Sequence, residues 1–373
     1  MKKQRSRTAA FAAASLLLSF APAAQAVPDP KTPAPAVLAK GLLSPLHISD
    51  GHDGSVLVSE EFAGRLTRIG RNGSVTTVYE KSAWDVAGSD RRGKTVYFAE
   101  SQGAGTGGKI ALAGHLRSID ADGKQRTVGD LAALETKENA DAGNSYGFRS
   151  LPTACAAQLP PQVEASYKGH VDSHPYGIEV YGDTIYVADA GANSIVSVDV
   201  RTGETETVAV LPPRPHRFTA AEAKAVGLPG CVSGQTYNFE PVPTDVKRGP
   251  DGWLYVTSLP GGPEDPALGA RGAVFKINPH SGRVKMFADD VMSPTGLDMD
   301  DEGNVYVASL FGAGVLRLSA HSGKEHVVLP ATLAADVDVR GDTLYATVNS
   351  LPEPNKAPEG RVVSVPLEHD SDD

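Results

Sequence analysis

Short apolar runs separated by tight-turn sequences recur along nearly the whole chain. In six copies, an alternating apolar and polar run meets a turn that contains Gly or Asp, and a second run such as VYVAS follows. The copies begin at Ser44, Ala83, Pro175, Pro243, Pro294 and Ala335. Alternation with a period of two residues is typical of half-buried strands, and an internal repeat is typical of propellers and solenoids. The pattern therefore predicts six repeated hairpin units.

Each unit continues with two more strands, joined by a second turn that contains glycine in five of the units. These turns are Asn72-Gly73, Asp122-Gly123, Thr202-Gly203, Ser281-Gly282 and Ser322-Gly323. Glycine supplies the positive φ angles that tight hairpins require. Four strands in each of six units, with no long helical pattern, predict an all-β fold, a six-bladed β-propeller.

The sixth unit lacks a sequence for its outermost strand. The segment 36–43 resembles the fourth strands of the other units, so we expect this N-terminal strand to pair into the last blade and close the ring. Closure would remove the free sheet edges that promote aggregation. The alternative is an N-terminal segment that stays unpaired.

Five insertions interrupt the repeat, and all fall in connections expected on one face. The insertions are 102–113, 131–174, 212–241, 260–270 and 351–358. We call this face the decorated face and the opposite one the plain face. Loops on a rigid scaffold are common binding elements. Inside the two longest insertions we expect short helices at 131–137, at 153–158 and after Thr219, where Glu222 completes a capping box.

The only two cysteines, Cys155 and Cys231, lie one in each of the two longest insertions. In an oxidising compartment two cysteines usually pair, so we predict a disulfide that joins both insertions into a lid. The alternative is a pair of free buried thiols.

The N-terminus has the pattern of a secretory signal peptide over residues 1–26. A basic segment is followed by an apolar run over residues 8–20 and by the small-residue sequence Ala24-Gln25-Ala26. The run is short for a membrane span of about 20 residues, although an anchor is the alternative. We expect a Pro-rich linker at 27–35, the propeller at 36–368, an acidic tail at 369–373 and a secreted, extracellular or periplasmic mature protein.

The net charge of the chain limits the classes of partner that it is expected to bind. The formal charge is −10, and without the basic first 26 residues it becomes −14, from 31 basic against 45 acidic residues. This balance argues against nucleic acid and anionic membranes and is compatible with a cation, a neutral ligand or a basic partner. No second apolar stretch is long enough for membrane insertion of the mature chain, and we expect a monomer.

Residues at the inner strand ends on the decorated face are the candidate ligand-binding residues. They are His47, Asp85, Tyr176, Asp189, Asp245 and Asp336. Carboxylates and histidine around one channel could bind a divalent cation. Alternatively, such carboxylates accept hydrogen bonds from backbone amides and channel water. The chain contains neither GxSxG nor HExxH, so no catalytic residue is assigned, and the Gly-rich segment 103–108 is expected to be a loop.

Four motifs carry a family resemblance over nearly all of the mature chain. They are VDSHPYGI (171–178), YVADAGANSI (186–195), FEPVPTD (239–245) and SLPGGPEDP (258–266). Together they resemble the ScyD/ScyE family. The resemblance implies an NHL-like six-bladed propeller and export from the cytoplasm, and it implies no particular reaction.

Broader relatives of this family include metal-dependent lactonases of the gluconolactonase type. Those enzymes place Asn or Asp after the proline that opens several inner strands, where this chain has Tyr176, Thr244 and Thr295. The resemblance therefore does not extend to the lactonase metal ligands. We expect a binding protein for a small molecule, a glycan or a protein. The alternative is a hydrolase, lactonase or secondary-metabolite tailoring enzyme that uses the channel carboxylates.

Overall fold

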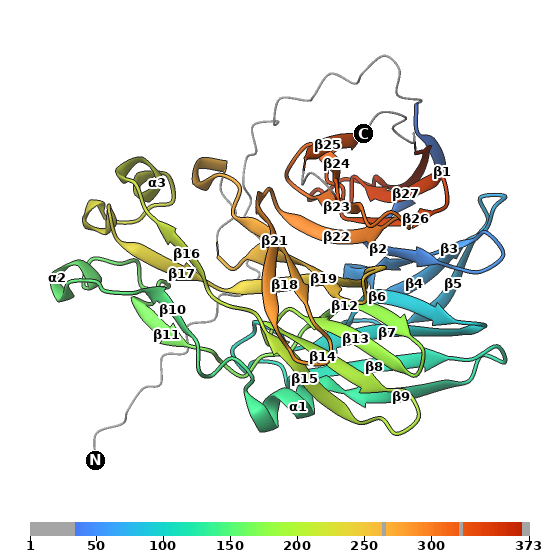
Figure 1. The fold of residues 1–373 in the computed structure, drawn as a ribbon, viewed down its shortest axis with the longest axis horizontal. Helices are drawn as coiled ribbons and strands as arrows, with labels where there is room; N and C mark the ends of the chain where they lie inside the picture. Colours follow the sequence, from blue (N-terminus) through green and yellow to red (C-terminus); the bar gives the residue numbers. More distant parts are fainter. Residues whose placement is uncertain (1–33, 263–265, 321–323, 368–373) are drawn as a thin grey trace.

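The fold is built almost entirely from antiparallel strands (Figure 1). The computed structural model describes residues 34–262, 266–320 and 324–367. Within these residues the strands form seven four-stranded sheets. The predicted signal peptide, the linker up to residue 33, the turn at Gly323 and the acidic tail lie outside the described residues.

Six of the sheets follow the sequence repeat. The first contains β2 (Pro45–Asp50), β3 (Val56–Glu60), β4 (Arg65–Ile69) and β5 (Val75–Glu80). The second contains β6 (Asp85–Arg92), β7 (Thr95–Gln102), β8 (Ala113–Ile119) and β9 (Gln125–Asp130). The third contains β12 (Pro175–Tyr181), β13 (Thr184–Asp189), β14 (Ser194–Asp199) and β15 (Thr205–Val210).

The remaining three repeat sheets come from the second half of the chain. The fourth contains β18 (Pro241–Arg248), β19 (Leu254–Pro260), β20 (Gly272–Ile277) and β21 (Val284–Val291). The fifth contains β22 (Pro294–Met299), β23 (Val305–Ser309), β24 (Gly314–Leu318) and β25 (Glu325–Pro330). The sixth contains β26 (Asp336–Arg340), β27 (Thr343–Val348), β28 (Gly360–Pro366) and β1 (Ala36–Leu42).

The innermost strands contact one another in sequence around an axis. The order is β2, β6, β12, β18, β22, β26 and again β2. Apolar side chains fill the space between neighbouring sheets, for example Leu57 and Leu66 of the first sheet against Phe98 of the second. Each strand therefore contributes side chains to two interfaces because successive residues point to opposite faces.

The N-terminal strand occupies the predicted position. β1 pairs antiparallel with β28, with Ala36 opposite Ser364 and Leu42 opposite Gly360. The buried side chains of Ala39 and Leu42 pack with Ile48 and Val58 of the first sheet. The two ends of the described chain are thus joined in one sheet.

The seventh sheet was not predicted, because the insertions were expected to contain only loops and short helices. It consists of β11 (Ser166–Lys168), β10 (Ser145–Phe148), β17 (Thr236–Phe239) and β16 (Arg214–Arg217). These strands come from both long insertions, which together we call the lid. Figure 1 shows the lid sheet extending from the ring beside α2 (Thr153–Ala156) and α3 (Ala220–Ala225).

The lid has its own core and the predicted disulfide. Cys155 and Cys231 are bonded, with their Cα atoms 5.9 Å apart. Phe148, Phe218 and Tyr237 pack around this bond. The predicted helices are present as α1 (Leu131–Glu138), α2 and α3, and Thr219 and Glu222 form the predicted capping box.

Short 3-10 turns occur at Glu61–Ala63, Gly230–Val232 and Pro266–Leu268. Among the described residues no helix is long and apolar enough to cross a bilayer.

Candidate functional site

Five side chains gather where the inner strands of the first three sheets begin on the decorated face. They are His47 of β2, Glu61 of the turn after β3, Asp85 at the start of β6, His174 just before β12, and Tyr176 of β12. We call them the axial cluster. His47 and Glu61 are almost completely buried, whereas the side chains of Asp85 and His174 are 39% and 24% exposed. The cluster therefore has a buried floor and a rim that solvent reaches.

The backbone after β3 places Glu61 in this cluster. The Glu61 N–H donates to the Ser44 carbonyl oxygen at 3.0 Å. The turn ends at Gly64, whose φ of 63° is left-handed. A Cβ at that position would lie 2.2 Å from the Lys81 carbonyl oxygen, so only glycine fits there. The turn is thereby fixed, and its first side chain points inward.

Asp189 holds the segment that carries His174. Its carboxylate accepts hydrogen bonds from the His174 N–H at 2.7 Å and from the Ser173 hydroxyl at 2.6 Å. The N–H groups of Gly191 and Ala192 donate to the same carboxylate. Asp189, a predicted ligand-binding residue, is therefore a positioning residue in this structure. Whether it also contacts a ligand stays a prediction.

The imidazole and carboxyl groups of the axial cluster converge without hydrogen bonds between them, whereas the Tyr176 hydroxyl donates to Glu61. His174 Nε2 lies 3.7 Å from both Glu61 Oε1 and Asp85 Oδ2, and His47 Nε2 lies 3.8 Å from Glu61 Oε2. These distances are too long for hydrogen bonds. His47 Nε2, His174 Nε2 and Glu61 Oε2 are buried and have no hydrogen-bond partner within the part of the chain that the structure describes. Unpaired buried polar atoms are costly, so their convergence indicates a site for an additional group.

Burial is the main cause of the pKa shifts of His47 and Glu61. It lowers the pKa of His47 to about 3, with the positive charges of Lys247 and His174 adding to the effect. Burial also raises the pKa of Glu61 well above its usual value, and the nearby charge of Asp85 contributes. His47 is therefore a neutral imidazole at neutral pH, with a lone pair available to a ligand.

The donor set fits a divalent cation. Among the described residues, Glu61, Asp85 and His174 form the one group of three potential ligands whose donor atoms lie within 4.8 Å of one another. Bonds of about 2.0–2.5 Å to one ion place neighbouring donor atoms about 3–4 Å apart. The two separations from His174 Nε2, 3.7 Å to Glu61 and 3.7 Å to Asp85, are in that range. Mixed imidazole and carboxylate ligands suit zinc and manganese.

The other predicted site residues lie elsewhere or make structural bonds. Asp245 accepts the N–H of Leu297 at 3.0 Å, and Asp336 accepts the N–H of Ile48 at 2.8 Å, so each links neighbouring sheets. Asp336 still lies 3.7 Å from His47 Nδ1. Thr244 and Thr295 donate to carbonyl oxygens of the next sheet, Pro294 at 3.1 Å and Ala335 at 2.7 Å. The hydroxyl groups of Thr244 and Thr295 are therefore used in hydrogen bonds between sheets of the ring. A ligand-binding role for Asp245 and Asp336 stays a prediction.

Below the axial cluster the channel holds one lysine among several acids. Lys247 Nζ lies 3.7 Å from Glu179. Burial alone would lower the pKa of Lys247, but the carboxylates of Asp245 and Glu179 outweigh burial and raise it well above its usual value. Burial raises the pKa of Asp298 to about 7 and that of Glu179 to about 8. The positive charge of Lys247 is thus compensated by carboxylates of the same layer. Such internal compensation favours a structural role for these residues.

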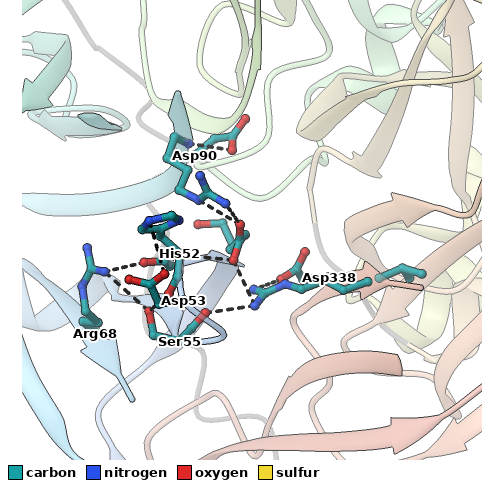
Figure 2. Close-up of polar contacts among 12 residues, drawn as sticks. His52, Asp53, Ser55, Arg68, Asp90 and Asp338 are labelled. Atoms are coloured by element: carbon teal, nitrogen blue, oxygen red, sulfur yellow. Dashed lines mark hydrogen bonds and ion pairs between the residues drawn. The ribbon is translucent and has the colours of Figure 1, made fainter. Parts of the chain in front are cut away.

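At the plain face an ion-pair network joins the first, second and sixth sheets (Figure 2). Asp50 accepts a hydrogen bond from Arg91 at 2.8 Å and pairs with Arg340 at 3.1 Å. Arg340 also pairs with Asp338, and its Nη1 donates to the Ser55 carbonyl oxygen at 2.9 Å. The network holds the first and last repeat sheets together at the end of the channel opposite the axial cluster.

A separate cavity of about 550 Å³ lies between the lid and the ring. We call it the lid cavity. The Gly-rich loop predicted at 103–108 lines it, together with Asp141, Tyr167, Asn193 and Glu240. No member of the axial cluster is among its lining residues. Glu240 bonds to Tyr167 and Asn193, while Arg149 donates to Asn238.

Sequence reasoning missed Glu61. By its place in the repeat, Glu60 at the end of β3 is the residue expected to face the axis. Its carboxylate accepts hydrogen bonds from Arg65 and Thr67 inside its own sheet. The only signal was the doubled acid Glu60-Glu61 at the end of a strand. His174 lies within the motif VDSHPYGI (171–178), which carried the family resemblance but did not assign it to a site.

No known family model and no curated protein matches this sequence. Solved structures with similar folds include an aldose sugar dehydrogenase from Streptomyces coelicolor in its PQQ-bound form, at 14% identity and a TM-score of 0.55, covering 89% of this chain and 96% of that one. A gluconolactonase from Xanthomonas campestris is similar at 15% identity and a TM-score of 0.50, over 93% and 99% of the two chains. A virginiamycin B lyase from Staphylococcus aureus with quinupristin is similar at 15% identity and a TM-score of 0.50, over 90% and 99%. At these identities the likeness shows the propeller-like fold alone.

Proposed function

We propose that this chain is an exported six-bladed propeller of the ScyD/ScyE type whose axial cluster binds a divalent cation and acts on a small ester or lactone. The observation that carries the proposal is the convergence of His47 Nε2, His174 Nε2 and Glu61 Oε2, which are buried and unpaired. The count of six blades is supported by the six inner strands that contact one another around the axis, with the seventh sheet assigned to the lid.

Three features of the chain support export. They are the signal-peptide pattern over residues 1–26, the disulfide in the lid and the resemblance to ScyD/ScyE proteins. Disulfides form and persist mainly in oxidising compartments. These features together support a mature protein that works outside the cytoplasm, and the monomeric state stays a prediction.

Different residues of the axial cluster would bind the cation and act on the substrate. Glu61, Asp85 and His174 would hold the ion, and a bound ion would polarise a carbonyl oxygen of the substrate. His47 is neutral and buried beside Tyr176, with ring centroids 4.4 Å apart, and its unpaired Nε2 would accept a hydrogen bond from the substrate. The exposed sides of Asp85 and His174 leave a path for the substrate.

Metal analysis of the purified protein tests the proposal. We expect about one equivalent of a divalent ion in the wild type, and loss of that ion in both Glu61→Gln and His174→Ala. Glu80→Gln and His280→Ala are matched controls, because both residues are exposed and lie outside the cluster. A panel of lactones and esters should then reveal hydrolysis that disappears in the same two variants. Absence of ion binding after Mn²⁺ and Zn²⁺ titration would contradict the proposal.

A binding role without catalysis is the second candidate. The observation that favours it is that the lid is an ordered unit with its own sheet, core and disulfide on the decorated face. A small molecule, a glycan or a protein partner would then bind there. Ligand binding that persists in Glu61→Gln, together with no turnover of any substrate in the panel, would favour this candidate.

A further inference from the structure

Two residues that line the lid cavity carry hydrogen-bond acceptors without a partner among the described residues. Asp141 and Asn193 are 2% and 1% exposed, and the unpaired atoms are Asp141 Oδ1 and Asn193 Oδ1. Both residues line the cavity. Two unpaired acceptors with nearly complete burial at one cavity wall require a donor from outside the chain.

The orientation of the Asn193 amide follows from its neighbours. Its Nδ2 donates to Asp141 Oδ2 at 2.9 Å and to Glu240 Oε2 at 3.2 Å. A flipped amide would place its oxygen against two carboxylates, which is unfavourable. Asn193 Oδ1 is therefore the atom left without a donor.

The wall of the cavity carries the carboxyl groups of Asp141 and Glu240, and His170 also lines it. Glu240 accepts from the Tyr167 hydroxyl at 2.8 Å, and Asp141 accepts from the Tyr146 hydroxyl at 2.8 Å. Among the described residues that line the cavity there is no lysine or arginine. Burial raises the pKa of both Asp141 and Glu240, and the two groups would favour ionisation beside a bound cation.

The size and shape of the cavity favour an organic ion over a metal ion. About 550 Å³ is the volume of a small-molecule site. The rings of Tyr167 and His170 stack at 5.6 Å in one of its walls, which provides a flat surface for an alkyl chain or a guanidinium group. Among the described residues, the one group of acids and histidines close enough for a metal ion is in the axial cluster.

We propose that the lid cavity is a second binding site, which takes a small organic cation with a primary ammonium or guanidinium group. The cation donates to Asp141 Oδ1, Asn193 Oδ1 and the carboxylate of Glu240, and its chain lies along Tyr167 and His170. The site shares no residue with the axial cluster, so the inference does not rest on the proposed enzymatic function.

Calorimetric titration of the full protein with agmatine tests this site. Agmatine carries both an ammonium and a guanidinium group, and 1,4-butanediol serves as the uncharged comparison. We expect saturable binding of agmatine in the micromolar to low millimolar range, and binding at least tenfold weaker in Asp141→Asn and Glu240→Gln. Glu353→Gln is the matched control because Glu353 is exposed in another insertion of the decorated face, and it should bind as the wild type does.

Several outcomes would overturn the proposal. These are no saturable agmatine binding, equal binding of 1,4-butanediol, or unchanged affinity in both acid variants when circular dichroism shows them folded. Displacement of agmatine by Ca²⁺ at lower concentration would identify a metal site instead. Glu61→Gln should leave agmatine binding intact, so failure of this site and failure of the axial cation site are distinguishable.

Discussion

Glu60 and Glu61 are neighbours in sequence with opposite environments. Although burial opposes it, the hydrogen bonds of Glu60 with Arg65 and the Leu43 N–H lower its pKa. Glu61 is completely buried, and burial and the nearby charge of Asp85 raise its pKa, although a hydrogen bond with the Tyr176 hydroxyl opposes the shift. The turn after β3 separates the two side chains, one into the sheet and the other toward the axis. A cation that binds to the Glu61 carboxylate must therefore displace the proton that this group holds.

We predict that divalent-cation binding strengthens as pH rises. Because the pKa of Glu61 is raised, the ion has to displace a proton from this carboxyl group. Displacement of one proton gives up to about a tenfold gain in affinity per pH unit below that pKa. Calorimetry with Mn²⁺ between pH 5 and 8 measures it. In Glu61→Gln the affinity should be low with a flatter pH dependence, and a pH-independent wild type would refute the assignment.

His47 gives a prediction about stability in acid. Its pKa in the folded protein is about 3, below the unfolded value of 6.5, so the unfolded chain binds more protons between these values. Stability therefore falls as pH drops below about 6.5, by about 1 kcal/mol per pH unit from this group. We expect the difference in unfolding free energy between wild type and His47→Gln to shrink from pH 7 to pH 4. Urea denaturation at each pH measures it, and a constant difference would show that folding does not lower the pKa of His47.

At the scale of elements, the lid differs most from the sequence-based expectation. The ring strands alternate regularly, so their positions and turns are visible in the sequence. The lid strands have three or four residues each, and β10 pairs with β17 from an insertion about 90 residues away. Short strands have little periodicity, and pairing between distant segments leaves no local pattern. The cysteines did indicate that the two insertions meet, but not that they form a sheet.

The disulfide should stabilise the lid considerably. It joins residues separated by 76 positions, and the chain-entropy model gives about 4 kcal/mol for a loop of this length. We expect Cys155→Ser/Cys231→Ser to lose about 2–4 kcal/mol of unfolding free energy, with lid strands cleaved first in limited proteolysis. Reductant should destabilise the wild type and leave the double variant unchanged. Equal protease resistance in the two proteins would show that the lid core alone is sufficient.

The candidate site was predictable only in part. His47, Asp85 and Tyr176 were found because the repeat aligns the starts of the inner strands, which converge on the axis. Asp245 and Asp336 occupy equivalent places in that pattern, yet backbone N–H groups of the next sheet use their carboxylates. A sequence does not show which acid has a donor nearby. Glu61 depends on a turn of three residues, and the acceptors of the lid cavity depend on contacts between distant insertions.

At the scale of the whole molecule, closure joins the two ends of the described chain. β1 supplies the outermost strand of the sixth sheet, and Asp50 connects Arg91 and Arg340 across the plain face. The ring is thus closed by backbone pairing on the outside and by ion pairs near the axis. Without β1, strand β28 would expose its N–H and carbonyl groups as a free edge.

Truncation tests the importance of closure. We expect a chain that begins at Ser44, and therefore lacks β1, to lose at least about 3 kcal/mol of unfolding free energy, since burial of Leu42 and Ala39 is lost. It should also form higher oligomers through the free edge of β28. A chain that begins at residue 34 retains β1 and is the control. Urea denaturation and size-exclusion chromatography measure both effects, and identical behaviour of the two chains would contradict the prediction.

The pairing of β1 with β28 also sets an order of events during synthesis. Residue 36 leaves the ribosome more than three hundred residues before its partner, Ser364, is available. Until then the nascent protein is an open arc with an unsatisfied strand at each end, and its final sheet does not exist. Growing chains in this state are vulnerable to pairing with one another. Closure of the ring therefore depends on the pairing of a strand made early in synthesis with one made more than three hundred residues later.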